Sequence, residues 1–281
     1  MFKKRNLLYP VSLAALILAG CGGNEGEKQT TSSEGTDEAS GREITVAVPP
    51  SNKPLSYTDE NGELTGYEVE ILKLVDEKLE DYSFEIVGVA DSAAEIGLDT
   101  GKYDMIAQGL FRSEAREEKY LIPEESNGAS LMRVYSNKNA GTIDGFEDLV
   151  GKKINPPSPG GGVFNLLTDY NNENPDNPIE FQTSDHGFTV AERLKEVESG
   201  KYDALVLPSN LGAAEIIEAQ SLEITTSEPI KVFPTYFLIH NKEENKAFTE
   251  EVSNAIKELK EEGKLSELSL EFYNEDVFQY E

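Results

Sequence analysis

The chain has 281 residues and carries 53 acidic against 25 basic side chains, for a formal net charge of −28. A charge of that sign and size repels nucleic acid, which excludes nucleic-acid-binding proteins, and we attribute it to a solvated surface rather than to an acidic binding patch. The single cysteine excludes a disulfide within the chain, and the two histidines, His186 and His240, offer no Cys/His cluster for a structural zinc ion. We therefore expect no metal and no other cofactor.

The first residues indicate export. A basic start at residues 3–5 precedes a mostly apolar stretch at residues 7–18, which is shorter than the about 20 apolar residues that a membrane-spanning helix needs. We interpret residues 1–20 as a signal peptide that is removed from the mature protein. Residues 18–21, Leu-Ala-Gly-Cys, resemble the lipobox of bacterial lipoproteins and predict a lipid on Cys21. The alternative is an ordinary signal peptide followed by a chance cysteine.

The next segment, residues 22–41, contains no large apolar side chain. Such a segment cannot bury enough apolar surface to offset the entropy that it would lose on ordering. We expect residues 21–41, beginning at the lipidated cysteine, to form a disordered tether between the membrane and the folded remainder of the chain.

The folded part opens with alternating strands and helices, identified by the period of their apolar residues. This order is typical of an α/β chain with a parallel sheet. The predicted elements are a strand at residues 43–48, a turn at 59–63, a helix at 67–79, a strand at 82–87, a helix at 93–100 ended by Gly101, and a strand at 105–107.

An internal repeat suggests two similar lobes. Residues 100–107, Thr-Gly-Lys-Tyr-Asp-Met-Ile-Ala, closely resemble residues 199–206, Ser-Gly-Lys-Tyr-Asp-Ala-Leu-Val. Both copies connect a short predicted helix to an apolar strand. Short repeat periods are typical of stacked arrays, whereas a single repeat about 100 residues away is not.

The second half of the chain continues the alternation of strands and helices. Its predicted elements are a strand at residues 131–135, a helical turn and a strand within 146–154, a helix at 163–170 that follows a run rich in proline and glycine, a strand at 230–239, and an amphipathic helix at about 245–262 that is ended by Gly263.

Five segments, taken in order, resemble the amino-acid-binding proteins of ABC importers, the extracellular solute-binding proteins of family 3. Within that family the sequence is most similar to cystine-binding members. The five segments are residues 54–70, 104–116, 146–152, 234–239 and the last helix, and the likeness extends over residues 42–276.

The resemblance implies an α/β chain with the two-lobe, type II fold of periplasmic binding proteins. In that fold two hinge strands connect the lobes, which close over a ligand. The likeness places lobe 1 at residues 42–133 and 230–281 and lobe 2 at residues 134–229, and it puts the crossings near residues 133–136 and 227–233.

Arg116 is the residue that the resemblance assigns to the ligand carboxylate. A guanidinium offers two parallel donors that match the two carboxylate oxygens. Ser113 stands where the family has a hydroxyl residue that adds another donor. The alternative interpretation is that Arg116 only neutralises the neighbouring Glu114, Glu117 and Glu118.

The glycine run at residues 160–162 is expected to meet the same carboxylate from lobe 2. Glycines allow a close approach of the backbone, and free N–H groups at the start of a helix attract anions. A flexible loop is the alternative interpretation. The full set of ligand contacts that the resemblance implies is Asn52, Tyr57, Gly109, Leu110, Phe111, Ser113, Arg116, Gly161, Gly162, Val163 and Ser209.

The sequence departs from the family at the residues that accept the ligand ammonium. Pro208 stands where many members have an aspartate, and near the first strand Pro49 and Asn52 stand where some have an acidic and an aromatic residue. Glu68 or Asp185 could substitute for the missing acceptor. Phe111, in place of a small hydroxyl residue, either offers the ligand an apolar wall that suits sulfur or belongs to the core.

The function that the resemblance implies is that of a substrate-binding lipoprotein of an ABC importer, which passes an amino acid or amino-acid-like solute to a membrane permease. The protein would be a monomer and not an enzyme, held by its lipid on the outer side of the cell membrane. Two alternatives remain, because fold does not determine function. They are an enzyme on the same fold, such as a cyclohexadienyl dehydratase, and a ligand-sensing subunit that signals to a kinase.

Overall fold

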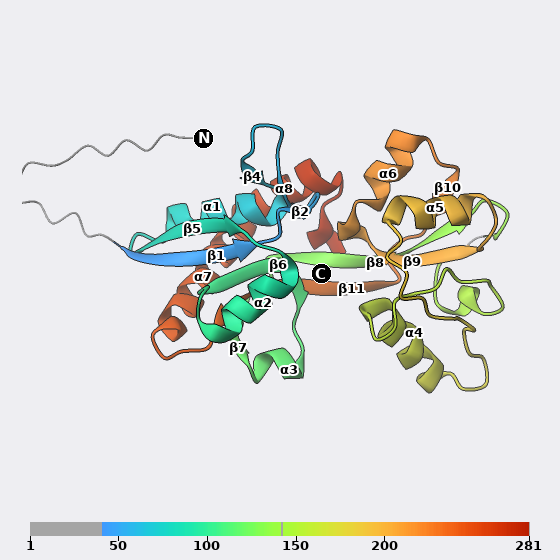
Figure 1. The fold of residues 1–281 in the computed structure, drawn as a ribbon, viewed down its shortest axis with the longest axis horizontal. Helices are drawn as coiled ribbons and strands as arrows, with labels where there is room; N and C mark the ends of the chain where they lie inside the picture. The colour runs from blue at the N-terminus through green and yellow to red at the C-terminus, as the bar shows by residue number, and fades with distance from the viewer. Residues whose placement is uncertain (1–40, 142, 281) are drawn as a thin grey trace, which may run out of the picture. The chain divides into compact units, whose positions relative to one another are not determined.

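The computed structural model describes residues 41–141 and 143–280. The expected signal peptide, Cys21 and the tether up to residue 40 lie outside the described residues. Figure 1 shows two groups of strands and helices, and the long strands β8 and β11 run between them. The fold is the two-lobe α/β arrangement that the sequence predicts.

Lobe 1 is a mixed sheet with helices on both faces. In the sheet, β1 lies between the parallel strands β5 and β6, and β11 runs antiparallel to β6. Ile44 and Val46 of β1 point into a core formed with α1, α7 and α8, whereas Ala47 points to α2 on the other face. The bounds are β1 Arg42–Val48, α1 Tyr67–Lys78, β5 Tyr82–Gly88, α2 Asp91–Thr100, β6 Met105–Phe111, β11 Lys231–His240, α7 Asn245–Glu261 and α8 Lys264–Tyr273.

In lobe 2 the same hydrogen-bonded sheet continues through β8, again with helices on both faces. Strands β9 and β10 are antiparallel neighbours of β8. Val134 and Val206 point to the face covered by α4, whereas Tyr135 and Leu205 point to α5 and α6. The bounds are β8 Gly128–Asn137, α4 Gly162–Glu173, α5 Val190–Glu198, β9 Ala204–Pro208, α6 Ala213–Gln220 and β10 Ile224–Thr226.

Several short elements complete the described chain. Strands β2, β3 and β4 form a separate antiparallel sheet beside lobe 1. The bounds are β2 Ser51–Asn52, β3 Ser56–Thr58, β4 Leu64–Thr65, α3 Glu114–Glu117, β7 Tyr120–Leu121, and the 3₁₀ helices η1 Glu147–Leu149, η2 Ser209–Leu211 and η3 Val277–Tyr280.

The predicted elements are confirmed with small changes of bounds, with one exception. The strand expected to end at residue 154 is reduced to a single parallel bridge between Ile154 and Ala204. Asn155 still donates to the Ala204 carbonyl, but Pro156 and Pro157 come next, and because proline has no N–H group it cannot donate to a ladder. The strand therefore stops where the proline- and glycine-rich run begins.

Strand β8 belongs to both lobes. Its first residues, from Gly128 to Met132, pair with β11, and its later residues, from Met132 to Ser136, pair with β9. The chain returns to lobe 1 along the segment that leads from Ser227 into β11. The Ser227 amide donates to the Val134 carbonyl, and the Val134 amide donates to the Ser227 hydroxyl, both at 2.9 Å. These two adjacent connections are the hinge strands of the fold.

Arg133 fastens the hinge to the end of the chain. The residue is 8% exposed, and its guanidinium donates to the Ser227 carbonyl, the Glu275 carboxylate and the Tyr280 hydroxyl. A buried guanidinium needs such partners because an unpaired buried charge is costly. Arg133 thus joins β8, the second connection and the segment after α8. We refer to these contacts as the Arg133 clamp.

The repeated Gly-Lys-Tyr-Asp sequence has the same structural role in each lobe. The amide of Asp104 donates to the Thr45 carbonyl at 3.0 Å, and the Asp104 carboxylate accepts from the Thr45 amide at 3.2 Å. Asp203 makes the same two bonds with Lys153, both at 2.8 Å. In each lobe the aspartate holds the incoming strand against its parallel neighbour, so the repeat marks equivalent junctions.

Candidate functional site

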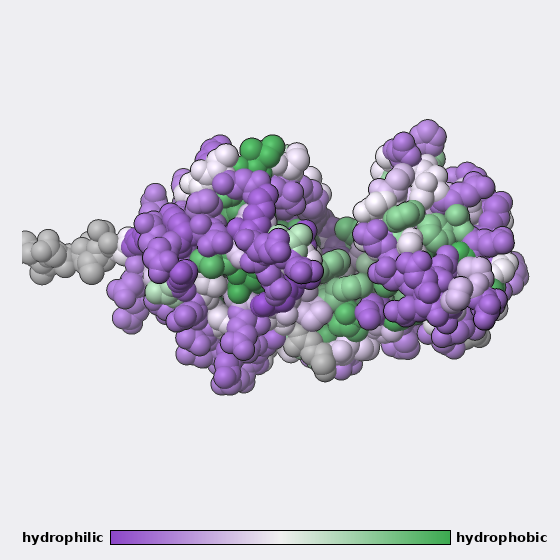
Figure 2. Space-filling model, turned by 90° about the horizontal axis from the view of Figure 1, so that it is seen from below, coloured by the Kyte–Doolittle hydropathy of each residue, from purple (hydrophilic) through white to green (hydrophobic). Residues whose placement is uncertain are grey.

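A cavity of about 610 Å³ opens between residues of lobe 1, the hinge strands and one face of α4. Figure 2 shows apolar surface in the hollow where the two groups of elements meet. A cavity of this size, with an apolar wall and a few polar groups, is typical of a small-molecule site. Its lining residues are Phe111, Ser113, Met132, Phe146, Gly162, Asn165, Leu166, Asp169, Tyr170, Glu173, Lys231 and Phe233.

Two stacked aromatic rings form the apolar wall. Phe111, at the end of β6, stacks on Phe233 of β11 with the ring centroids 4.9 Å apart. Met132 lies on the neighbouring strand β8, directly opposite Lys231. Phe111 is only partly buried and lines the cavity, so of its two predicted roles the structure favours the wall over the core.

The start of α4 brings unpaired amides to the cavity. Gly161 is the N-cap residue and has no side chain to accept from the first-turn N–H groups, which in any helix lack a partner within the helix. Gly162, the first residue of α4, lines the cavity. These amides and the positive end of the helix dipole can bind a carboxylate. Gly161 itself donates to the Ser158 carbonyl, and Val163 packs into the core of lobe 2.

Arg116 lies beside the wall rather than in the lining. It is partly buried on the short helix α3 and donates to the Phe111 carbonyl at 2.7 Å. Ser113, the N-cap residue of that helix, lines the cavity directly. In the described part of the chain, Glu117 pairs with Arg112 and no ion pair joins Arg116 to its acidic neighbours. The interpretation that Arg116 only neutralises the acidic run therefore has no support in the contacts.

Gly109 and Glu68 form a support behind the wall. Gly109 has φ +63, a conformation that favours glycine, and donates to Glu68 at 3.0 Å, while the Asn127 side-chain amide donates to the other oxygen at 3.0 Å. Glu68 is 1% exposed, and burial raises the pKa of its carboxyl to about 7. Glu68 is therefore committed to holding the end of β6 and is not placed to accept a ligand ammonium. The side chain of Leu110 packs in the core.

Four other candidates lie outside the cavity. Asn52 donates weakly to Asp91 at 3.4 Å, and Tyr57 lies under the ammonium of Lys53. Ser209 accepts from the Leu131 amide and lines a different cavity, of about 350 Å³, together with Arg133 and Glu275. Asp185 is exposed and does not line the 610 Å³ cavity.

Sequence reasoning anticipated the start of α4 but missed the side chains farther along that helix and those of the second hinge strand. Asn165, Asp169 and Glu173 recur at intervals of four residues and so share one helix face, which lines the cavity. Lys231 and Phe233 are alternate residues of β11 and project to the same side. The glycine run before α4 is the sequence signal that could have directed attention to this helix face.

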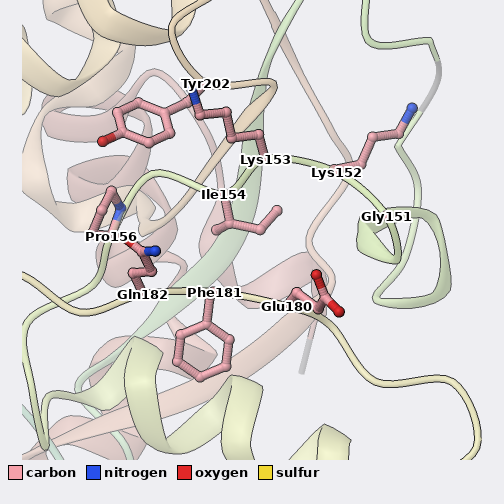
Figure 3. Close-up of a pocket in the computed structure, with 9 residues that line it drawn as sticks. All are labelled: Gly151, Lys152, Lys153, Ile154, Pro156, Glu180, Phe181, Gln182 and Tyr202. Carbon is pink, nitrogen blue, oxygen red and sulfur yellow. The ribbon is translucent and has the colours of Figure 1, made fainter.

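Another cavity, of about 550 Å³, lies within lobe 2 (Figure 3). In Figure 3, Ile154 lies between Tyr202 and Phe181, and the ring of Phe181 is directed away from Ile154. The cavity is lined by residues 151–154 and Pro156 on one stretch of chain and by residues 180–182 on another. All its walls belong to lobe 2 and no predicted ligand residue lines it, so we place the candidate site at the cavity that α4 and the hinge strands share.

Nothing in the described residues points to a metal or to a membrane-spanning helix. Residues 41–141 and 143–280 contain no group of three or more His, Cys, Asp and Glu side chains placed to hold an ion. No helix in those residues is both long enough and apolar enough to cross a bilayer. His240 is partly buried with its Nδ1 atom 2.7 Å from the Leu98 carbonyl, and His186 is exposed.

Comparison with known proteins agrees with the two-lobe α/β fold and identifies the family of the protein. The family described as bacterial extracellular solute-binding proteins, family 3, matches residues 44–275. The L-cystine-binding protein TcyK of Bacillus subtilis (strain 168) is 27% identical over 262 residues, which are 92% of each chain.

Two solved structures resemble the chain along most of its length. The first is a Bacillus subtilis protein described as the "probable amino-acid ABC transporter extracellular-binding protein ytmK", with a TM-score of 0.73 and 26% identity over 84% of this chain and 99% of that one. The second is the unliganded, open L-cystine solute receptor of Neisseria gonorrhoeae, with a TM-score of 0.66 and 21% identity over 84% and 94% of the two chains.

Proposed function

Because the chain belongs to the bacterial extracellular solute-binding proteins, family 3, we propose that it is the substrate-binding lipoprotein of an ABC importer and that its ligand is L-cystine. It captures the ligand between lobe 1, residues 42–133 and 230–281, and lobe 2, residues 134–229, and delivers it to the permease as a monomer. The resemblance to TcyK, named as an L-cystine-binding protein, supports this choice of ligand.

The observation that carries the proposal is the chemistry of the 610 Å³ cavity. Ser113 lines the cavity, and Arg116 lies beside its wall, bonded to the Phe111 carbonyl; on the other side are the first amides of α4. In this proposal these groups are the donors that bind the α-carboxylate. The cavity wall has the stacked rings of Phe111 and Phe233 beside Met132. Aromatic rings make favourable contacts with sulfur, which suits the centre of a cystine molecule.

A thermal-shift screen of all amino acids plus cystine tests the ligand. A ligand present at 100 times its dissociation constant adds about 2.7 kcal/mol of apparent stability, because it binds the folded state alone. We expect L-cystine to give the largest rise in melting temperature. A larger rise with another amino acid would replace cystine as the ligand while keeping the transport role, and no rise with any of them would contradict the proposal.

The lipid anchor is part of the same proposal, because a binding protein must stay near its permease. It rests on the Leu-Ala-Gly-Cys sequence ending at Cys21. We expect Cys21→Ser to give either protein released into the medium or an uncleaved precursor, since the acylated thiol is lost. Partitioning into the detergent phase measures this, with the wild-type chain as the control. A variant that still partitions like wild type would refute lipidation at Cys21.

The enzyme alternative gains no support from the site. We propose that the protein is not an enzyme, because its named relatives are transport binding proteins and we identify no nucleophile with an adjacent base in the cavity lining. Incubation with prephenate and arogenate tests this directly, and turnover of either would overturn it.

A further inference from the structure

We infer that the cleft cavity contains a second head-group subsite, in which Lys231 binds a distal carboxylate and Asp169 binds a distal ammonium. The ligand class is then a molecule with an amino-acid head group at each end. The inference rests on the proposed function, because it assigns the far end of the same ligand.

The first observation is a set of charged side chains without partners. Asp169, Glu173 and Lys231 line the cavity, and within the described residues none of the three has a hydrogen bond or an ion pair through its side chain. In a chain with 53 acidic and 25 basic residues, a lysine commonly finds a carboxylate, as Lys78 and Lys242 do. Lys231 is exposed and lines the cavity, so its ammonium is accessible to an anionic group of the ligand.

The second observation is where these charges lie along the wall. Thr235 of β11 is opposite Phe111, and Lys231 is four residues away on the same strand. At about 3.3 Å per residue the two positions are roughly 13 Å apart. The two α-carbons of a disulfide-linked pair are separated by about 5.5–6 Å, and each carries a head group directed outward. A molecule of that length can reach both ends of the wall, whereas a single amino acid reaches one.

The third observation is the order of chemistry along that length. Arg116 and Ser113 lie at the lobe 1 end, and the stacked rings of Phe111 and Phe233 form the middle. Lys231, directly opposite Met132, forms the other end, in a cavity that the α4 carboxylates also line. A cation, an apolar stretch, and then a second cation in a cavity lined by carboxylates match one head group, a sulfur-containing link and a second zwitterionic head group. This arrangement also supplies an ammonium acceptor in a chain that has Pro208 at the usual acidic position.

The test compares a ligand with two head groups and a ligand with one. Calorimetric titration with L-cystine and S-methyl-L-cysteine is carried out on wild type, Lys231→Ala and Asp169→Asn. We expect wild type to prefer cystine at least tenfold, and each variant to lose most of that preference because only cystine reaches the second subsite. Lys257→Ala removes the same charge from the exposed face of α7 and is expected to keep the preference.

The outcomes separate this inference from the proposed function. Variants that keep the wild-type preference overturn the subsite while cystine remains the ligand. Variants that bind L-cystine and S-methyl-L-cysteine more weakly by the same factor also overturn the subsite. That result would indicate instead an ion pair between Lys231 and α4 that forms when the lobes close. A wild-type chain that binds S-methyl-L-cysteine as tightly as cystine overturns the subsite, and one that binds neither overturns the proposed ligand as well.

Discussion

Arg116→Ala is expected to weaken ligand binding by about 30-fold to several thousand-fold while leaving folding nearly unchanged. The guanidinium reaches the Phe111 carbonyl at the wall of the cavity, where a ligand carboxylate would lose its water on closure. Removing one partner of a buried, hydrogen-bonded charge pair costs roughly 2–5 kcal/mol, mostly because the other charge is left unpaired, and each 1.4 kcal/mol is about tenfold in affinity. Calorimetric titration with the best ligand from the screen measures the loss.

Two further variants and a control sharpen this test. Arg116→Lys is expected to recover only part of the affinity, because an ammonium cannot form the two-pronged contact. Ser113→Ala is expected to cost about 1 kcal/mol, the contribution of a typical hydrogen bond. Arg112→Ala is the matched control, since Arg112 pairs with Glu117 and does not line the cavity. Binding by Arg116→Ala within threefold of wild type would show that the carboxylate is held elsewhere.

Glu68→Gln is expected to stabilise the protein at pH 8 by up to roughly 3 kcal/mol and to have little effect at pH 4. Burial raises the pKa of Glu68 from the ordinary 4.5 to about 7, and that difference corresponds to roughly 3 kcal/mol against the ionised form. Glutamine keeps an acceptor for the Gly109 amide. The Asn127 amide group now directs its Nδ2 at Glu68. Turned over, it would present its buried oxygen, which has no hydrogen-bond partner in the described structure, to the glutamine NH2.

The sign of the pH dependence follows from the raised pKa. Between pH 4.5 and 7 the folded state binds more protons at Glu68 than the unfolded state does, so the contribution of this group to stability is fully present below 4.5 and is lost as the pH rises through 7. Urea unfolding of wild type and variant at pH 4, 6 and 8 measures the difference. Glu77→Gln, on the exposed side of the same helix, is the control. A difference that does not change with pH would contradict the assignment.

Much of the fold could be predicted from local sequence signals. Apolar residues at helical spacing predicted α1, and the alternation of residues 43–48 predicted β1. The repeated Gly-Lys-Tyr-Asp sequence was predictive because the bonds that it makes are local to one junction, with Asp104 and Asp203 each holding the neighbouring strand. The strand before Pro156 was overestimated, because the apolar pattern does not register the missing N–H groups.

The candidate site was less predictable, because it is made by contacts between distant segments. The resemblance directed attention to Phe111, Ser113 and Gly162, and these three residues do line one cavity. It could not reveal that Ser209 is bonded to the hinge strand or that Glu68 is bound by Gly109 and Asn127. Lys231 and Asp169 carry no local motif, since a charged residue on a strand or helix usually faces solvent. Only the fold shows that both border the same cavity.

The Arg133 clamp has a practical consequence for handling this protein. Deletion of residues 274–281 would remove Glu275 and Tyr280, two of the partners of the Arg133 guanidinium. It would leave a buried cation on a hinge strand without its carboxylate. A purification tag or fluorescent fusion attached at that end would be joined to the same segment and could disturb the contacts of Glu275 and Tyr280. Reporters of binding should therefore be joined ahead of residue 41, where the described fold begins, so that the readout leaves the balance between open and closed forms unaltered.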